Sequence, residues 1–229
     1  MWLVAIAFAA AHDLAVAAHA PPATTAAEAA APFAVPATFA RVLPCADCAG
    51  IAHTLTLRAD GLYFSRQTPL GNPGGSVSQA GGWDFNDEAA RLTLYRGTGR
   101  QHFAFRNGEL LQLDSNDQAI VSRMNPALRR AAQVDAGSDI VRWHGKFRYV
   151  AGSTYFLNCD TGALGWPVAE QADYAALVDS YNHARSEPGA PLMVTFDGHL
   201  AVFHAADGPA LEQMVVDRFV AVHPNTSCP

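Results

Sequence analysis

The chain contains four cysteines, two of which lie close together in the segment Cys45-Ala46-Asp47-Cys48. Two thiols at this spacing can chelate one soft cation, close a small disulfide or exchange electrons with another thiol pair. Two thiolates suit Cu(I), which accepts low coordination numbers and prefers sulfur. A closed zinc site needs four ligands, and the sequence has no second C-x-x-C or paired-histidine motif to supply them. Cys45 and Cys48 are therefore a candidate Cu(I) site, and a structural disulfide or a surface thiol pair is the alternative.

His53 is the best third ligand for such a site, because it follows Cys48 closely in the sequence. It also alternates with Ile51 and Leu55, and this pattern equally predicts a histidine packed in the core. A thioredoxin-like redox centre is disfavoured, because its C-x-x-C opens a helix after a parallel strand, whereas the segments here read as antiparallel strands. Asp47 would also disfavour thiolate formation.

The other two cysteines, Cys159 and Cys228, both lie in the second half of the chain. An even number of cysteines in an exported protein favours disulfides. A bridge between these two would tie the C-terminal tail to an early strand of the second half. In the chain-entropy model, closing so long a loop contributes about 4 kcal/mol to stability.

The N-terminus reads as an export signal. Trp2 to Ala10 is an apolar run of suitable length, and Ala18-His19-Ala20 has the form of a cleavage site. We therefore predict a signal peptide over 1–20. Residues 21–37 are dominated by Ala, Pro and Thr and predict a disordered tether, because they have little apolar surface to bury.

From residue 38 the pattern changes to short segments of alternating apolar and polar residues. His53 to Arg58 reads HTLTLR, and Leu62 to Arg66 follows it after a turn at Asp60-Gly61. Similar strands continue to a last one expected near Ala119 to Arg123. Short strands at this spacing predict an antiparallel β-barrel or sandwich over 38–123.

We interpret residues 124–138 as a linker and 139–229 as a second domain. The second domain reads as three strands, one helix and further strands, which is the order of an OB-type barrel. The helix is predicted from Asp173 to Arg185 by the apolar spacing of its residues. Asp197-Gly198 is interpreted as a turn between two of the later strands.

Composition excludes several classes of function. The chain has 15 basic and 21 acidic residues, a net charge of -6, and no cluster of Lys and Arg along the sequence, so nucleic-acid binding is not expected. The body of the chain has no apolar run long enough for a transmembrane span. No catalytic triad, nucleotide-binding loop or paired-carboxylate motif is recognisable, so we do not expect an enzyme.

The chain resembles the NlpE family, envelope proteins linked to copper resistance and to the sensing of envelope stress. The resemblance implies a lipocalin-like β-barrel over 38–123, with a C-x-x-C near its start, followed by an OB-like module. The residues that carry it are Leu43-Pro44-Cys45-Ala46-Asp47-Cys48-Ala49-Gly50-Ile51, Asp60-Gly61-Leu62-Tyr63, Gly82-Trp83, Arg91-Leu92-Thr93-Leu94, Leu113-Asp114-Ser115, Gly145-Lys146-Phe147-Arg148-Tyr149 and Phe156-Leu157-Asn158-Cys159-Asp160-Thr161-Gly162.

The resemblance implies a periplasmic or envelope location, a copper-responsive pair at Cys45 and Cys48, and a histidine-kinase signalling system as partner. Typical members are lipoproteins with an acylated cysteine at the end of the signal peptide, and no cysteine precedes Cys45 here. Either the given start lies downstream of that segment or this member is soluble in the periplasm. The competing hypothesis is a lipocalin-like module that binds an apolar ligand or a partner, with purely structural cysteines.

Overall fold

The computed structural model describes residues 31–45, 47–71, 73–120, 127–161, 164–204 and 208–228. The predicted signal peptide, the first part of the predicted tether and the end of the strand expected near Ala119 to Arg123 lie outside these residues. Ala119 itself forms only an isolated bridge with Leu113. No helix among the described residues is both long enough and apolar enough to cross a bilayer.

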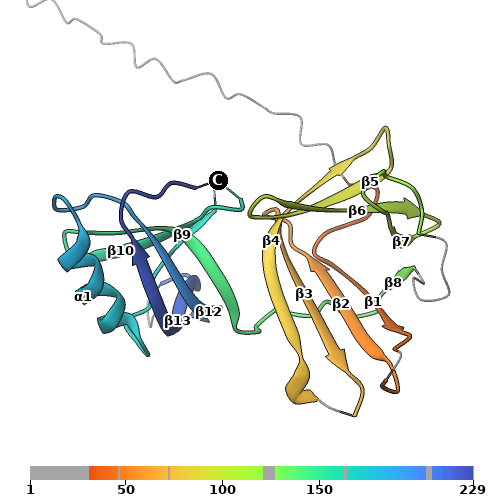
Figure 1. Cartoon of the computed structure of the whole chain (residues 1–229), viewed down its shortest axis with the longest axis horizontal. Coiled ribbons are helices and arrows are strands. Elements are labelled where there is room, and N and C mark those ends of the chain that lie inside the picture. The colour runs from red at the N-terminus through yellow and green to blue at the C-terminus, as the bar shows by residue number, and fades with distance from the viewer. Residues whose placement is uncertain are drawn as a thin grey trace, which may run out of the picture.

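The first half of the chain is a closed antiparallel barrel of eight strands, seen on the right of Figure 1. Each strand pairs with the next along the chain, and β8 pairs back to β1, which leaves no open edge. Alternate side chains point inward because a strand has a period of two residues. The strands are β1 (Ala37–Leu43), β2 (Ile51–Leu57), β3 (Leu62–Pro69), β4 (Val77–Asn86), β5 (Arg91–Arg96), β6 (Gly99–Arg106), β7 (Glu109–Gln112) and β8 (Leu128–Arg130), with the short 3₁₀ helix η1 (Pro73–Gly75) between β3 and β4.

The barrel is filled by a buried apolar core that includes Phe39, Leu55, Leu57 and Leu92. Phe33 joins this core although the sequence places it in the tether; only 9% of its surface is exposed. Its ring packs edge-on against Phe39 and Phe85, with ring centroids 5.3 and 5.8 Å away. One aromatic side chain thus orders a segment that is otherwise too poor in apolar residues to order itself.

The predicted linker also contains part of the barrel. Leu128 is buried and pairs with Leu110, and Arg130 pairs with Phe39 of β1. Strand β8 is therefore the piece that closes the barrel. Leu128–Arg130, predicted as linker, forms a strand because two neighbouring strands supply its hydrogen bonds.

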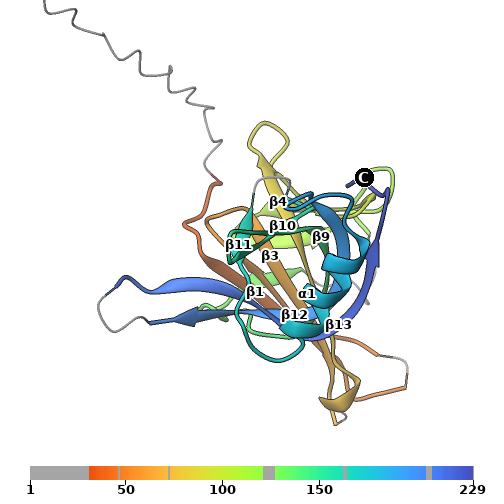
Figure 2. The ribbon, with the colours of Figure 1, turned by 90° about the vertical axis from the view of Figure 1, so that its left-hand side faces the viewer.

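The second half is a five-stranded antiparallel sheet with one helix, seen on the left of Figure 1. The strand order is β11-β10-β9-β12-β13, and the helix packs mainly against β13. Figure 2 shows the long β12–β13 hairpin extending beyond the rest of this domain. The elements are β9 (Val141–Val150), β10 (Ser153–Asn158), β11 (Gly165–Pro167), α1 (Tyr174–Ala184), β12 (Leu192–Phe203) and β13 (Leu211–His223).

The predicted helix is confirmed: Leu177 and Tyr181 lie one turn apart on its buried face. The predicted turn at Asp197-Gly198 is wrong, because β12 continues through these residues with irregularities in its pairing. Asp197 is held by ion pairs with Arg142 and Arg218 on the two flanking strands. These contacts outweigh the local turn preference of Asp-Gly.

The apolar core of the second domain extends onto the outer face of the barrel, apart from the core that fills the barrel. Leu62, Phe64 and Ala80, which point out of the barrel, are buried in the same cluster as Val141 and Trp143 of the second domain. The rings of Phe64 and Trp143 meet edge-on with centroids 6.3 Å apart. The outer face of β3 and β4 is therefore an interior surface of the whole molecule.

Candidate functional site

Cys45 and Cys48 lie in the connection that joins β1 to β2. The two strands end as a pair, with Leu43 opposite Ile51, so residues 44–50 form the loop. Gly50 closes the loop in the left-handed region, with φ +144°, and a Cβ there would come within 2.7 Å of Val42 Cγ1. Both cysteines therefore lie half-buried in a loop at one end of the barrel.

The structure joins Cys45 to Cys48 in a disulfide, with their Cα atoms 5.3 Å apart. In this state neither sulfur is a thiolate, which is the form that binds a metal. Reduction by a dithiol adds two electrons and two protons and yields two thiols on one short loop. This donor pair fits Cu(I) in its reduced state, because two sulfur ligands suffice for that ion.

His53 lies inside the barrel, where 6% of its surface is exposed. Its Nε2 forms a 3.1 Å hydrogen bond with the hydroxyl of Ser65, and burial lowers the pKa of the ring. The structure does not bring this ring together with the cysteine pair. Among the described residues, no three His, Cys, Asp or Glu side chains are grouped so that they could hold a metal ion.

Cys159 and Cys228 are joined in a second disulfide across 69 positions of sequence. Cys159 directly follows β10, and its backbone N–H donates to the carbonyl of His144 in β9 at 3.2 Å. The bridge therefore fixes the C-terminal tail to the body of the sheet. The Cys159 Sγ also lies 3.5 Å from the Sδ of Met193.

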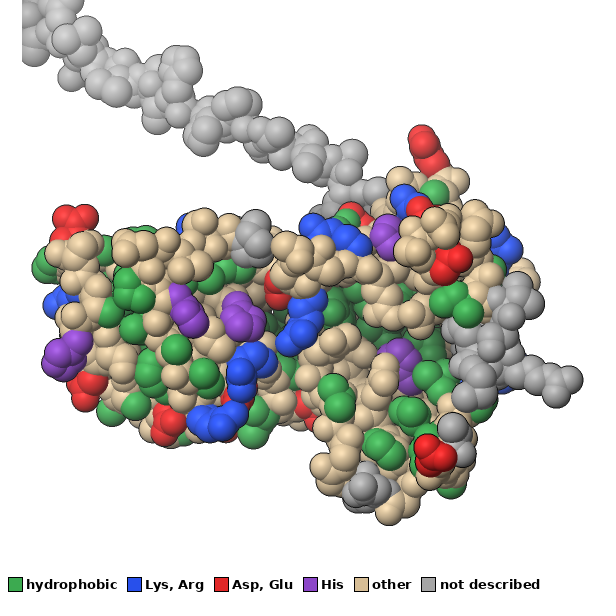
Figure 3. Space-filling view, viewed as in Figure 1, with side chains coloured by type: hydrophobic (Ala, Val, Ile, Leu, Met, Phe, Trp, Pro, Cys, Tyr) green, Lys and Arg blue, Asp and Glu red, His purple; other side chains and the backbone are tan. Residues whose placement is uncertain are grey.

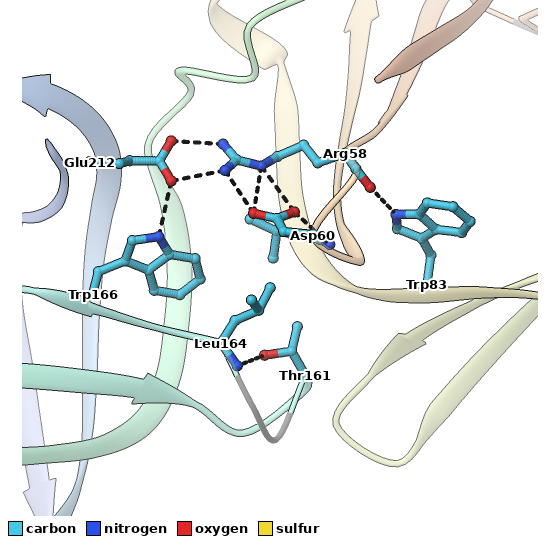
Figure 4. Close-up of polar contacts among 8 residues, drawn as sticks. Arg58, Asp60, Trp83, Thr161, Leu164, Trp166 and Glu212 are labelled. Atoms are coloured by element: carbon cyan, nitrogen blue, oxygen red, sulfur yellow. Dashed lines mark hydrogen bonds and ion pairs between the residues drawn. The ribbon is translucent and has the colours of Figure 1, made fainter. Parts of the chain in front are cut away.

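A polar contact that sequence reasoning missed joins the two halves (Figure 4). Arg58 of the barrel donates from Nη1 and Nη2 to the two carboxylate oxygens of Glu212 in β13, both at 2.8 Å. The Nε1 of Trp166 donates to the same carboxylate at 3.0 Å. Burial acts to lower the pKa of Arg58, but its hydrogen bonds to Glu212 and Asp60 outweigh burial and raise it. No sequence signal marks this pair, because its members lie 154 positions apart.

The barrel also carries a hollow of about 830 Å³ where residues 31–35 cross its mouth. Phe33, Val35, Trp83 and Phe85 are among the residues that line it. Such a volume falls within the range of small-molecule sites, which are usually apolar with a few polar groups.

These features define a class of protein: a closed eight-stranded β-barrel and a small β domain with one helix, each with its own disulfide. Comparison with known families agrees with this class. Residues 39–123 match the NlpE N-terminal domain, and residues 138–229 match the NlpE C-terminal OB domain. The chain belongs to the NlpE family.

Two relatives illustrate the similarity. The chain is 29% identical to Lipoprotein NlpE of Escherichia coli (strain K12) over 196 residues, which cover 85% of this chain and 81% of that protein. The crystal structure of the Cpx pathway activator NlpE from Escherichia coli is 28% identical, with a TM-score of 0.37, over 84% of this chain and 98% of that one.

Proposed function

We propose that this protein is a non-enzymatic component of the cell envelope that takes part in envelope-stress signalling and copper homeostasis. Its family membership supports the signalling role, since a relative with 28% identity is described as a Cpx pathway activator. Its place would be the periplasm or the envelope, as the lipoprotein relative suggests. A sensor histidine kinase would be the partner.

The observation that carries the copper part is the position of Cys45 and Cys48 on an irregular loop at the end of a rigid barrel. The loop is anchored on both sides, by the pairing of Leu43 with Ile51 and by a 2.8 Å hydrogen bond from Leu70 N to Gly50 O. Both cysteines are half-buried, so the loop is open to an ion or an oxidant from solvent. The reduced pair would hold Cu(I), and the oxidised pair would not.

The test is a Cu(I) titration of the reduced protein against a competing chelator. We expect one copper per chain for the reduced wild type, and loss of this binding in Cys45→Ser. The matched control is Cys159→Ser combined with Cys228→Ser, which removes the other sulfur pair and should keep the stoichiometry. Equal binding by Cys45→Ser and the wild type would overturn the copper proposal.

A second candidate function is favoured by the hollow at the barrel mouth. Apolar side chains from β4 and from the segment 31–35 line a space large enough for a small apolar ligand. A fluorescent fatty acid tests this function by its emission on titration. Enhancement that is lost in Trp83→Ala but kept in Cys45→Ser would favour the ligand-binding module over the copper site.

A further inference from the structure

Basic side chains gather on one face of the molecule where the barrel meets the second domain. Figure 3 shows Lys and Arg side chains in a line across this junction, with His side chains beside them. The β5–β6 hairpin carries Arg96 and Arg100, which line one hollow. Strands β9 and β13 carry Arg142 and Arg218, which share one carboxylate. We define the basic junction as Arg96, Arg100, Arg142, Lys146 and Arg218. It holds a third of the 15 basic residues of a chain whose net charge is -6.

The two sides of the basic junction lie close in space. The pKa of His144 is lowered by burial and further by the charges of Arg96 in the barrel and Arg142 in the sheet, while the charge of Asp160 opposes this shift. Both cations therefore act on the same imidazole ring. His144 lies between Arg142 and Lys146 on the outward face of β9, since alternate residues of a strand share a face.

The positive charge of this surface is only partly neutralised. Arg142 and Arg218 share a single carboxylate, that of Asp197. Arg100 lies over the ring of Tyr95, and within the described part of the chain it donates only to backbone carbonyls, at 3.1 Å to Gly97 and 2.9 Å to Gly99.

The remaining two cations of the basic junction are Arg96 and Lys146. Among the residues that the structure describes, neither Arg96 nor Lys146 forms a hydrogen bond or an ion pair. The carboxylate of Asp160 lies nearby and accepts a hydrogen bond from the backbone of Gly97 at 2.5 Å. It keeps its negative charge and offsets part of the charge of Arg96, since both act on His144. The side-chain N–H groups of Arg96 and Lys146 are left available for an external anion.

The surface is also concave. A hollow of about 220 Å³ opens between Arg96 and Arg100 at the end of the barrel, with Tyr63 and Gln101 in its wall. Tyr63 is 2% exposed, and burial raises its pKa to about 12, an effect that the charge of Arg96 opposes and the charge of Asp160 strengthens. Two cations, Arg96 and Arg100, and two neutral polar residues, Tyr63 and Gln101, therefore line one small space.

We propose that the basic junction docks an acidic segment of a partner protein, with carboxylates bound by Arg96, Arg100 and Lys146. An extended acidic chain can place a carboxylate in the hollow and follow the cations across both domains. A planar layer of lipid headgroups would reach protruding cations but not the hollow. The proposal needs neither copper nor the cysteine pair, so it goes beyond the proposed function and fails or holds independently of it.

The test uses a fluorescein-labelled oligoglutamate peptide and measures its anisotropy with the full chain at low ionic strength. We expect saturable binding that weakens as NaCl is raised, because salt screens exposed charges. Arg96→Glu with Lys146→Glu should weaken it about tenfold or more. Arg96→Lys should retain most of it, since the charge remains. Circular dichroism of each variant verifies that it folds.

The matched control is Arg106→Glu compared with Arg96→Glu alone, because each changes the net charge by the same amount and Arg106 lies at the other end of β6 from Arg100. An equal loss of affinity in this variant would show a general effect of net charge and overturn the proposal. A second arm titrates phosphatidylglycerol vesicles. Binding to vesicles without binding to the peptide would overturn the proposal in favour of a membrane surface.

Discussion

Arg58 of the barrel and Glu212 of the second domain face each other with two parallel hydrogen bonds, both 2.8 Å long. About a quarter of each side chain is exposed, 25% for Arg58 and 26% for Glu212. The carboxylate also accepts from Trp166, and the guanidinium also binds Asp60. A charge pair with all these partners is stronger than an isolated surface pair, because its geometry is fixed from both sides.

The first prediction concerns this pair. A double-mutant cycle with Arg58→Gln and Glu212→Gln should give a coupling energy of about 1 kcal/mol in the free energy of unfolding by urea. The control cycle uses Arg129 and Glu109, a pair within the barrel whose side chains are 67% and 35% exposed. Its coupling energy should be no more than about 0.3 kcal/mol, because exposed pairs are weak. Equal coupling in the two cycles would show that the interdomain pair is an ordinary surface contact.

The second prediction concerns Phe33. Phe33→Ala removes a ring that contacts Phe39, Phe85 and Phe105, and should lower the free energy of unfolding by about 3 kcal/mol. Pro32→Ala changes an exposed neighbour and should have little effect. Urea unfolding of both variants gives the comparison. A small effect of Phe33→Ala would mean that the segment 31–35 does not stabilise the barrel.

Local sequence patterns account for most of the barrel. The alternation in His53 to Arg58 and the Asp60-Gly61 turn predict a hairpin, and the structure pairs Leu57 with Tyr63 and places Gly61 at φ +83°. A strand with one buried face can be predicted from sequence, because its residues alternate between apolar and polar. The helix of the second domain is predictable in the same way, because its buried residues, such as Leu177 and Tyr181, recur at helical spacing.

The differences from prediction arise where distant contacts decide the local structure. Leu128 to Arg130 is too short to show a period, and only pairing with β1 and β7 makes it a strand. Asp197-Gly198 carries a turn signal that ion pairs from two other strands override. The cysteine pair could be found from spacing alone, whereas the Arg58–Glu212 contact could not, since nothing local links its members.

The third prediction compares the two disulfides. Cys159→Ser with Cys228→Ser should lower the free energy of unfolding by about 4 kcal/mol, because a loop of 69 positions restricts the unfolded chain strongly. Cys45→Ser with Cys48→Ser opens a loop of only three positions and should cost about 2 kcal/mol. Both doubly substituted proteins are measured by urea unfolding at neutral pH. Loss of more stability at the short loop would contradict the entropic account.

The fourth prediction concerns pH. Burial lowers the pKa of His53 below its ordinary value of 6.5, so the unfolded chain binds a proton more readily than the folded one. The stability that this difference provides is fully present above pH 6.5 and is lost as the pH falls from 6.5 toward the lower pKa of the folded state. The physical cause is that a protonated ring would have to lose its hydration inside the barrel.

His53→Gln should therefore reduce the fall in unfolding free energy between pH 6.5 and mildly acidic pH, as measured by urea unfolding at a series of pH values. Burial also lowers the pKa of His144, so His144→Gln should reduce the fall independently, and the two substitutions together should reduce it further. The rings lie in different domains, so their effects should add. If the unfolding free energy of His53→Gln falls with decreasing pH as steeply as that of the wild type, the buried ring is not the source of the acid sensitivity.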